Sequence, residues 1–563
     1  MTSLEADAPQ LSAALERLAR EDVIGQLLDR RGRMAELATE DGDVKLDWTD
    51  QVAWALDHPE AIEGVERLAE SIRSRFAHVV WSGMGGSVQA VHTLKGLGLL
   101  EANDLSLHPL DSTDPAALNR LLREIADGGD LDSALRRTLM IGVSMGMTSE
   151  EPITHLQWFE GLLRSHGVGR PAEHLMVMTL PGSFLDRFAG ERGAARAEIQ
   201  LDGGAHIPGR MSAPSTRVFL LPAALGLGRG LAEVLRRCQA ETALGKGLTA
   251  AGRRRFVATD PFVRLAAWLS AQIDVGRYML VLDLPRRWAP LAPWVEQVVE
   301  ESLGKDGRGL LVFHEQDLAS AGSWPDRFSI LRVDEGSGAE PPDRPRAVLR
   351  LDPDGDHVSR LATCARCFSG WNLAVAMVGY LQGITFAGQP AVEAYKRYAR
   401  RLRDAPGGLP YPEDSLSDAG GGATLAAVIR RLQAEGRLGY FDLTVNADPA
   451  GPLWEAAQRA GRRFGNRVLC RPVKVRSGPR DYHSTEQSET AGPPDLLSLR
   501  VLVTDPEPVM AGDYPARFLH AQALGTLFAM RDAGRPVLMA TVRRAGGAAA
   551  LVELLEAATA LAH

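Results

Sequence analysis

Residues 79–94 read "VVWSGMGGSVQAVHTL". A short apolar run, of the kind buried in parallel sheets, ends in a turn with three glycines and a serine, and a helix-like segment follows. At such a junction, backbone N–H groups, a hydroxyl and the positive end of a helix can surround an anion. A tight turn that only needs positive φ accounts for the glycines equally well. The stretch therefore predicts a strand, a turn and a helix, and it leaves open whether the turn binds phosphate.

The alternation of strand and helix continues along the chain. "HVVWSG", "TLMIGVS" and "HLMVMTL" are short apolar strand candidates, and "YMLVLDL", "GRGLLVFHE" and "FSILRVD" form a second set that begins near residue 277. Alternating strands and helices predict parallel sheets with right-handed crossovers and helices on both faces. We therefore expect an α/β protein with two three-layer α/β/α lobes and parallel sheets, preceded by N-terminal helices.

Four segments are expected. Residues 1–75 have apolar positions at helical spacing and predict an N-terminal helical segment. Residues 76–250 form the first lobe, and residues 251–400 form the first part of the second lobe. A flexible joint rich in proline and glycine, at 405–422, precedes a return to α/β alternation. Residues 401–563 are therefore expected to complete the second lobe.

Composition argues against several classes of protein. The 563 residues carry a formal net charge of −8 and no basic run, which argues against a nucleic-acid or membrane-surface binder. The N-terminus lacks the features of a signal peptide, and no apolar stretch reaches the length of a membrane span. Four cysteines do not form a disulfide framework, which points to a reducing cytoplasm. Cys364 and Cys367 have no second ligand pair at a useful spacing, so no metal is expected.

A second turn with hydroxyl side chains follows another predicted strand. "SMGMTSEE", residues 144–151, comes after "TLMIGV" and precedes a helix. Ligands of open α/β sheets bind beyond the carboxyl ends of strands, where both turns lie. Ser144, Thr148 and Ser149 can bind one side of a phosphate, and they can also cap the helix. The two interpretations are compatible because a cap side chain lies where an anion can compete.

Six segments together carry a resemblance to a known family. They are "GMGGS" (83–87), "DSTDPAAL" (111–118), "SMGMTSEEP" (144–152), "HIPGRMSAPSTRVFLLPAAL" (206–225), "EQVVEESLGKDGRGLLVF" (296–313) and "GYLQGITFAGQPAVEAYK" (379–396). In this order they resemble the glucose-6-phosphate isomerase family, which has the two-lobed sugar-isomerase (SIS) fold. The tail segment "GPRDYHSTEQSETAGPPD" (478–495) is similar to the isomerase domain of transaldolase/isomerase fusions.

The resemblance has consequences for partners. Residues 1–75 are too few for a transaldolase barrel, so we expect the chain to correspond to the isomerase part alone. The family implies a homodimer, no cofactor, a small sugar phosphate as substrate and, for this branch, a functional link to a separately encoded transaldolase.

The resemblance also implies a catalytic set. In an aldose–ketose isomerase one carboxylate can move a proton between adjacent carbons through a cis-enediol. Glu301 matches the family's glutamate, and Gln297 lies one helical turn earlier on the same face. Arg210 matches the arginine expected to stabilise the enediolate, and Lys396 matches the lysine near the ring oxygen. A solvated surface glutamate and a structural arginine pair are the alternatives for Glu301 and Arg210. The residues expected to hold the phosphate are Gly85, Gly86, Ser87, Ser144, Thr148 and Ser149.

The sequence departs from the family's pattern in three places, one of which is Gly388, where the family has an acidic residue or Asn before its Gln. In the turn at 144–149, methionines stand at or beside the family's lysine and one hydroxyl, and methionine cannot donate a hydrogen bond to phosphate. Counting from Thr485 puts Glu489 where the family has its ring-opening histidine, and His483 matches an earlier histidine of the fusion branch. Four alternatives stay open: Glu489 with a raised pKa, His483, use of the open-chain sugar, and loss of ring opening.

We expect a cytoplasmic aldose–ketose isomerase that interconverts glucose 6-phosphate and fructose 6-phosphate. The alternatives are a non-catalytic sugar-phosphate-binding protein of the same fold and an isomerase of another phosphosugar. The altered 144–149 turn and Glu489 favour the non-catalytic alternative, and the altered turn also permits an isomerase of another phosphosugar. The combination of Glu301 with Arg210, Gln297 and Lys396 favours the enzyme.

Overall fold

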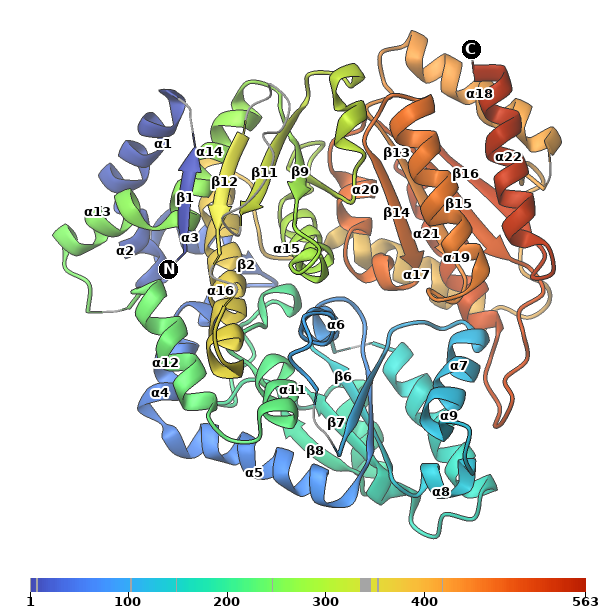
Figure 1. Ribbon diagram of the computed structural model, residues 1–563, viewed down its shortest axis with the longest axis horizontal. Helices are drawn as coiled ribbons and strands as arrows, with labels where there is room; N and C mark the ends of the chain where they lie inside the picture. Colours follow the sequence, from blue (N-terminus) through green and yellow to red (C-terminus); the bar gives the residue numbers. More distant parts are fainter. Residues whose placement is uncertain are drawn as a thin grey trace.

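The computed structural model describes residues 2–6, 9–101, 104–147, 149–245, 247–334, 346–351, 354–417 and 419–562. Three large sheets, each covered by helices, make up the molecule (Figure 1). In this view the first sheet lies at the bottom, the second at the upper left and the third at the upper right. Thr148, expected at the phosphate, lies outside the described residues.

The first lobe contains the glycine turn. Its five strands are parallel, in the order β5–β4–β6–β7–β8. Along β4 the side chains alternate: Val79 and Trp81 enter one apolar core, and Val80 enters another on the opposite face. The elements are β4 (His78–Ser82), α6 (Gln89–Gly96), β5 (Ser106–Leu110), α7 (Pro115–Ala126), α8 (Leu131–Leu135), β6 (Thr138–Ser144), α9 (Glu151–Ser165), β7 (Leu175–Thr179), α10 (Phe184–Arg192), β8 (Ala195–Glu198), α11 (Arg217–Leu227) and α12 (Leu231–Thr242).

The second lobe is built on a sheet with the order β1–β12–β11–β9–β10. β9, β10, β11 and β12 run parallel, and β1 pairs antiparallel with β12. The elements are α13 (Ala250–Thr259), α14 (Pro261–Asp274), β9 (Met279–Asp283), α15 (Ala292–Leu303), β10 (Leu311–His314), β11 (Phe328–Asp334), β12 (Arg346–Arg350), α16 (His357–Gln382) and α17 (Pro390–Asp404).

Residues 1–75 are mainly helical, as expected, but they also contain strands. β1 (Ser3–Ala6) pairs with β12 because an edge strand leaves N–H and C=O groups that another extended segment can satisfy. The other elements are α1 (Pro9–Arg20), α2 (Val23–Leu28), α3 (Gly32–Leu37), β2 (Thr39–Glu40), β3 (Asp43–Val44), α4 (Gln51–Asp57) and α5 (Pro59–Arg75).

The C-terminal residues form a parallel sheet of their own, in the order β14–β13–β15–β16. We expected residues 401–563 to complete the second lobe. In the structure their strands β13 to β16 pair with one another instead of extending the second sheet. Between the two sheets the amide of Gln316 takes the place of a neighbouring strand: it bonds both the N–H and the C=O of Val473, at 2.9 and 2.8 Å. The elements are α18 (Ala419–Ala434), β13 (Tyr440–Asn446), α19 (Pro452–Ala456), β14 (Val473–Gly478), α20 (Glu486–Ala491), β15 (Leu496–Val503), α21 (Arg517–Asp532), β16 (Val537–Val542) and α22 (Gly547–Ala562).

The tail nevertheless shares an apolar core with the second lobe. Val281 on β9 and Phe313 on β10 belong to the same buried cluster as Tyr440 on β13 and Leu527 on α21. Residues on the other face of β9, such as Leu280, pack into the cluster that contains α15 and α16. The C-terminal part of the chain thus covers a face of the second sheet that would otherwise be open.

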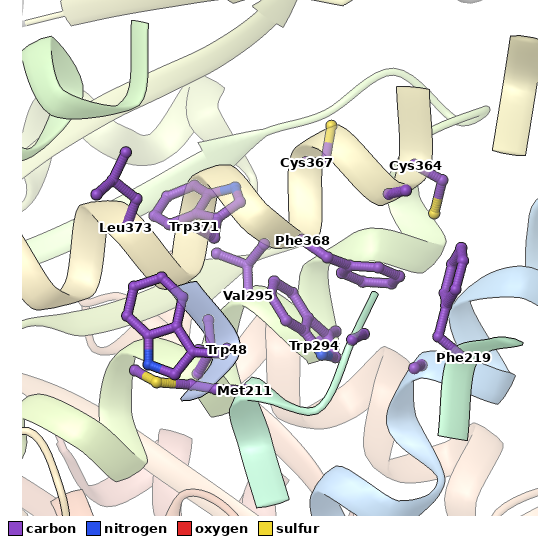
Figure 2. Packing of buried hydrophobic residues seen from close by; sticks show 14 of the residues in the cluster. Trp48, Met211, Phe219, Trp294, Val295, Cys364, Cys367, Phe368, Trp371 and Leu373 are labelled. Carbon is purple, nitrogen blue, oxygen red and sulfur yellow. The ribbon is translucent and has the colours of Figure 1, made fainter. Parts of the chain in front are cut away.

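Helix α16 runs through the interior. Among the described residues it alone is long and apolar enough to cross a membrane, and 94% of its most apolar window is buried inside the molecule, as in a core helix. Figure 2 shows Cys364 and Cys367 on this helix beside the aromatic packing around Phe368 and Trp294. Burial raises the pKa of the Cys367 thiol to about 12, so this thiol stays protonated at neutral pH.

Replacing Leu527 by alanine tests whether the tail and the second lobe share a core. Leu527 is fully buried, so we expect the free energy of unfolding in urea to fall by about 2–5 kcal/mol. Leu561→Ala is the control, since Leu561 is 47% exposed. Equal effects of the two substitutions would contradict a shared core.

Candidate active site

The glycine turn is a meeting point of three chain segments. Gly85 has φ +53°, and a Cβ there would collide with the carbonyl oxygen of His483. A Cβ on Gly86 would collide with the backbone of Gly209. Glycine is therefore needed at Gly85 for its positive φ and at both positions because other backbone atoms lie too close for a side chain. The turn brings the segments around Gly209 and His483 together at the carboxyl end of β4.

The second turn holds its hydroxyls toward each other. The Ser144 hydroxyl at the end of β6 donates to the Ser149 hydroxyl at 2.6 Å and accepts from the Gly146 N–H at 3.1 Å. α9 begins at Glu151 without a side-chain cap bond at its first residues. Ser144 and Ser149 are therefore not used as helix caps and are available for a ligand at this edge of the sheet.

A buried carboxylate lies beside the glycine turn. Arg210 Nη1 donates to Glu301 Oε1 at 3.0 Å, and Gln297 Nε2 donates to Glu301 Oε2 at 2.9 Å. Both donors and the carboxylate are at most 3% exposed. Burial raises the pKa of Glu301 above its ordinary value, although Arg210 and Gln297 oppose the rise. The group is therefore poised to exchange a proton more readily than an exposed glutamate.

His483 forms a hydrogen-bonded pair with Glu151. The two residues lie 2.6 Å apart, Nε2 to Oε1, and Gln522 Nε2 donates to the same oxygen at 2.7 Å. Burial would raise the pKa of Glu151, yet the charge and hydrogen bond of His483 hold it at about 2. The carboxylate thus fixes the orientation of the imidazole, while the backbone carbonyl of the same residue lies against Gly85.

Glu151 and Arg480 are functional candidates that the sequence analysis missed. Glu151 is the first residue of α9, directly after the second turn, and this position is the signal that could have found it. Arg480 binds the Asp111 carboxylate at 3.1 Å, Nη2 to Oδ1, and His92 Nε2 lies 2.8 Å from the other oxygen of Asp111. This contact fastens the loop that carries His483 to the first lobe.

The positive charge of Lys396 acts on the carboxylates of Glu151 and Glu301. Lys396 lies on α17, where Nζ donates to Glu393 at 2.7 Å, and its side chain is 18% exposed. Its positive charge contributes to lowering the pKa of both Glu151 and Glu301. Lys396 therefore borders the site from α17, a helix that packs against α20 and α21 of the C-terminal part.

Glu489 lies in a different environment. Its carboxylate pairs with Arg476 and, at 2.7 Å, with Arg500, and all three side chains are at most 3% exposed. It also accepts from the Thr485 hydroxyl at 3.2 Å. None of its described contacts is with Glu301 or the glycine turn. The Glu489 carboxylate is therefore the shared partner of two buried guanidinium groups.

Behind Glu301 lies a set of buried charges that we call the α15–β14 ion cluster. It joins Glu296 and Glu300 on α15 to Lys474 and Arg476 on β14. Arg476 Nη2 lies 2.9 Å from Glu296 Oε1 and 3.4 Å from Glu300 Oε2, and Lys474 also contacts Glu300. The cluster attaches the helix that carries Glu301 to the third sheet.

The expected site residues form two groups, one joined by direct contacts and one at the carboxyl ends of β4 and β6. Contacts join Gly85, Gly86, Arg210, Gln297, Glu301 and His483. Ser87 is buried in the glycine turn, and Ser144 and Ser149 lie at the neighbouring carboxyl end of β6.

Comparisons with known proteins show which sequences and folds this chain is similar to. No protein-family model matches the chain. A glucose-6-phosphate isomerase of Synechococcus sp. (strain JA-3-3Ab) is 26% identical over 459 residues, which cover 70% of this chain and 82% of that protein. One from Parasynechococcus marenigrum is 30% identical over 236 residues, which are 41% of this chain and only 39% of that protein.

Solved structures share the fold. A hypothetical protein of Thermus thermophilus has a TM-score of 0.57 and 21% identity, covering 72% of this chain and 100% of its own. A glucose-6-phosphate isomerase of Chlamydia trachomatis has a TM-score of 0.55 and 16% identity, covering 72% of this chain and 89% of its own. These likenesses confirm the expected sugar-isomerase fold.

Glu489→Gln tests whether Glu489 is a structural counter-ion. Removing one partner of a buried ion pair leaves charge uncompensated, so we expect the free energy of unfolding to fall by about 3 kcal/mol. The control is Glu435→Gln, whose pair with Arg437 is exposed and contributes below about 1 kcal/mol. A Glu489→Gln protein as stable as the wild type would contradict this role.

Proposed function

We infer that the chain, which belongs to the glucose-6-phosphate isomerase family, is a sugar-phosphate isomerase, and we propose that it interconverts glucose 6-phosphate and fructose 6-phosphate. The observation that carries the proposal is the buried Glu301 carboxylate, bound by Arg210 and Gln297 beside the glycine turn. A surface glutamate would be exposed, and a purely structural ion pair would not need to lie beside a glycine turn. Glu301 is buried, has a raised pKa and lies beside the turn that is proposed to bind the phosphate.

In the proposed reaction Glu301 moves one proton. The carboxylate removes the proton from C2 of the open-chain aldose, the C2–H electron pair forms the C1–C2 double bond, and the aldehyde oxygen becomes the enediolate oxygen. Arg210 stabilises this negative charge because its guanidinium is fixed within the site. Glu301, now protonated, returns the proton to C1, while the proton of the C2 hydroxyl moves to the C1 oxygen, so that C1 becomes a hydroxymethyl group and C2 becomes the ketone.

The phosphate is proposed to bind between the two turns at the carboxyl ends of β4 and β6. The backbone of Gly85 and Gly86 and the hydroxyls of Ser87, Ser144 and Ser149 provide donors there, and Thr148 joins them by its place in the sequence. Neither turn contains lysine or arginine. The phosphate group therefore contributes less to affinity than it would with a charge-assisted contact.

His483 is proposed to open the sugar ring. An imidazole can both accept and donate a proton near neutral pH, and Glu151 fixes its orientation. The Glu489 carboxylate is instead occupied by ion pairs with Arg476 and Arg500, and none of its described contacts is with Glu301 or the glycine turn. Of the alternatives raised by the sequence, this geometry favours His483.

Glu301→Gln tests the proton transfer. We expect kcat for fructose 6-phosphate, measured by coupled oxidation of the glucose 6-phosphate formed, to fall roughly a hundredfold or more. Glu435→Gln serves as the exposed control. In the wild type, Glu301 must be ionised to accept the proton, so kcat/KM falls as the pH drops through the raised pKa of Glu301. A wild-type protein that binds 6-phosphogluconate without any turnover would leave a sugar-phosphate-binding protein instead.

His483→Asn tests ring opening separately from proton transfer. Turnover of fructose 6-phosphate should fall roughly a hundredfold, because the positioned acid/base group is lost. Turnover of 5-deoxyfructose 6-phosphate, which cannot form the furanose ring, should stay close to that of the wild type. Equal losses with both substrates would contradict a role in ring opening.

A further inference from the structure

Lys305 is a buried cation that the proposed mechanism does not use. It follows Gly304, the residue that ends α15, and only 6% of it is exposed. Its Nζ donates to the backbone carbonyls of Thr385 and Ala387, each at 2.6 Å. Both acceptors belong to residues 385–388, the segment that links α16 to α17.

Arg210 binds the other two carbonyls of the same segment. Its Nη2 donates to Phe386 O at 2.6 Å and to Gly388 O at 3.4 Å. Four successive carbonyls are therefore bound alternately by two cations, Lys305 and Arg210. We call this arrangement the carbonyl clamp. On its other side the segment is held by Leu37 O, which accepts from the N–H groups of Phe386 and Ala387.

The surroundings of Lys305 make its burial costly. Arg210 repels it, while Glu301, Glu40 and Asp306 attract it from a distance. No carboxylate of the described residues lies within ion-pair distance of its Nζ. Burial, and next the charge of Arg210, lower the pKa of Lys305 to about 7. Buried charges without a paired counter-ion are rare because desolvation is expensive, and they concentrate at functional sites.

The clamp determines where Arg210 points. With Nη2 bound to Phe386 O, the planar guanidinium directs Nη1 to Glu301 Oε1 at 3.0 Å and Nε to Ser302 Oγ at 2.7 Å. A shift of the carbonyls would turn the whole group, since its donors form a rigid fork. Without Lys305, the carbonyls of Thr385 and Ala387 lose their donor, and since the Ala387 contact is buried, this loss favours such a shift.

We propose that Lys305 is a positioning residue for the isomerisation: by fixing residues 385–388 it holds Arg210 against Glu301 and sets the start of α17, which carries Lys396. This proposal rests on the proposed function. Lys305 would affect the rate through the position of Arg210 in the transition state, because a displacement of a catalytic group by about 1 Å can lower the rate roughly a hundredfold.

The experiment compares Lys305→Met, Lys305→Arg and Lys95→Met in the full-length protein. Methionine keeps the length of the side chain but removes its donors and charge, so we expect kcat for fructose 6-phosphate to fall at least about tenfold, with KM changed less than about threefold. Lys305→Arg keeps the donors and should restore most of kcat. Lys95→Met removes a lysine-to-carbonyl bond of 2.9 Å elsewhere in the first lobe and should leave kcat within about twofold.

The outcomes separate a positioning role from a structural one. A folded Lys305→Met protein with wild-type kcat would overturn the proposal, even if its melting temperature were lower. Should this variant not fold, Lys305→Gln replaces it, and wild-type kcat in folded Lys305→Gln would likewise overturn the proposal. Absence of turnover in the wild type would instead refute the proposed function, so the two failures are distinguishable.

Discussion

The attachment of α15 to β14 through buried ion pairs is the constraint on which the site depends. Glu296 and Glu300 face Lys474 and Arg476 behind the helix, while Gln297 and Glu301 face the glycine turn. Apolar packing alone would tolerate small rotations of the helix, whereas charges buried in pairs must keep their partners. The helix that carries the proposed proton-transfer group is therefore held by a sheet formed some 150 residues later in the chain, a connection that local sequence features do not reveal.

Much of the fold could be predicted from the sequence because parallel strands and amphipathic helices leave local patterns. β4 and its glycine turn, β6 and its hydroxyl turn, and α15 all lie where the pattern of apolar residues indicates. The separate third sheet could not be predicted, since periodicity identifies a strand but not its neighbour. The side chain of Gln316, bonded to both backbone groups of Val473, is a long-range contact without a local signature.

Some residues of the candidate site could likewise be predicted from the sequence, and others could not. Arg210, Gln297 and Glu301 come from segments that match a family motif, and in the structure they lie together. The distance from Thr485 along the chain predicts a ring-opening position for Glu489, but its environment is set by Arg476 on β14 and Arg500 on β15. Lys305 was part of a recognised motif, yet its role could not be derived without the path of residues 385–388.

The contact between Gly85 and the carbonyl of His483 has a consequence for synthesis on the ribosome. The glycine turn emerges almost 400 residues before its partner loop, because Gly85 and His483 are that far apart in the sequence. Domains fold as units in the order of their appearance, so the first lobe can be complete while one wall of the site is still unmade. A nascent chain would therefore have no complete sugar pocket until the tail has docked, which makes ligand binding a reporter of finished folding.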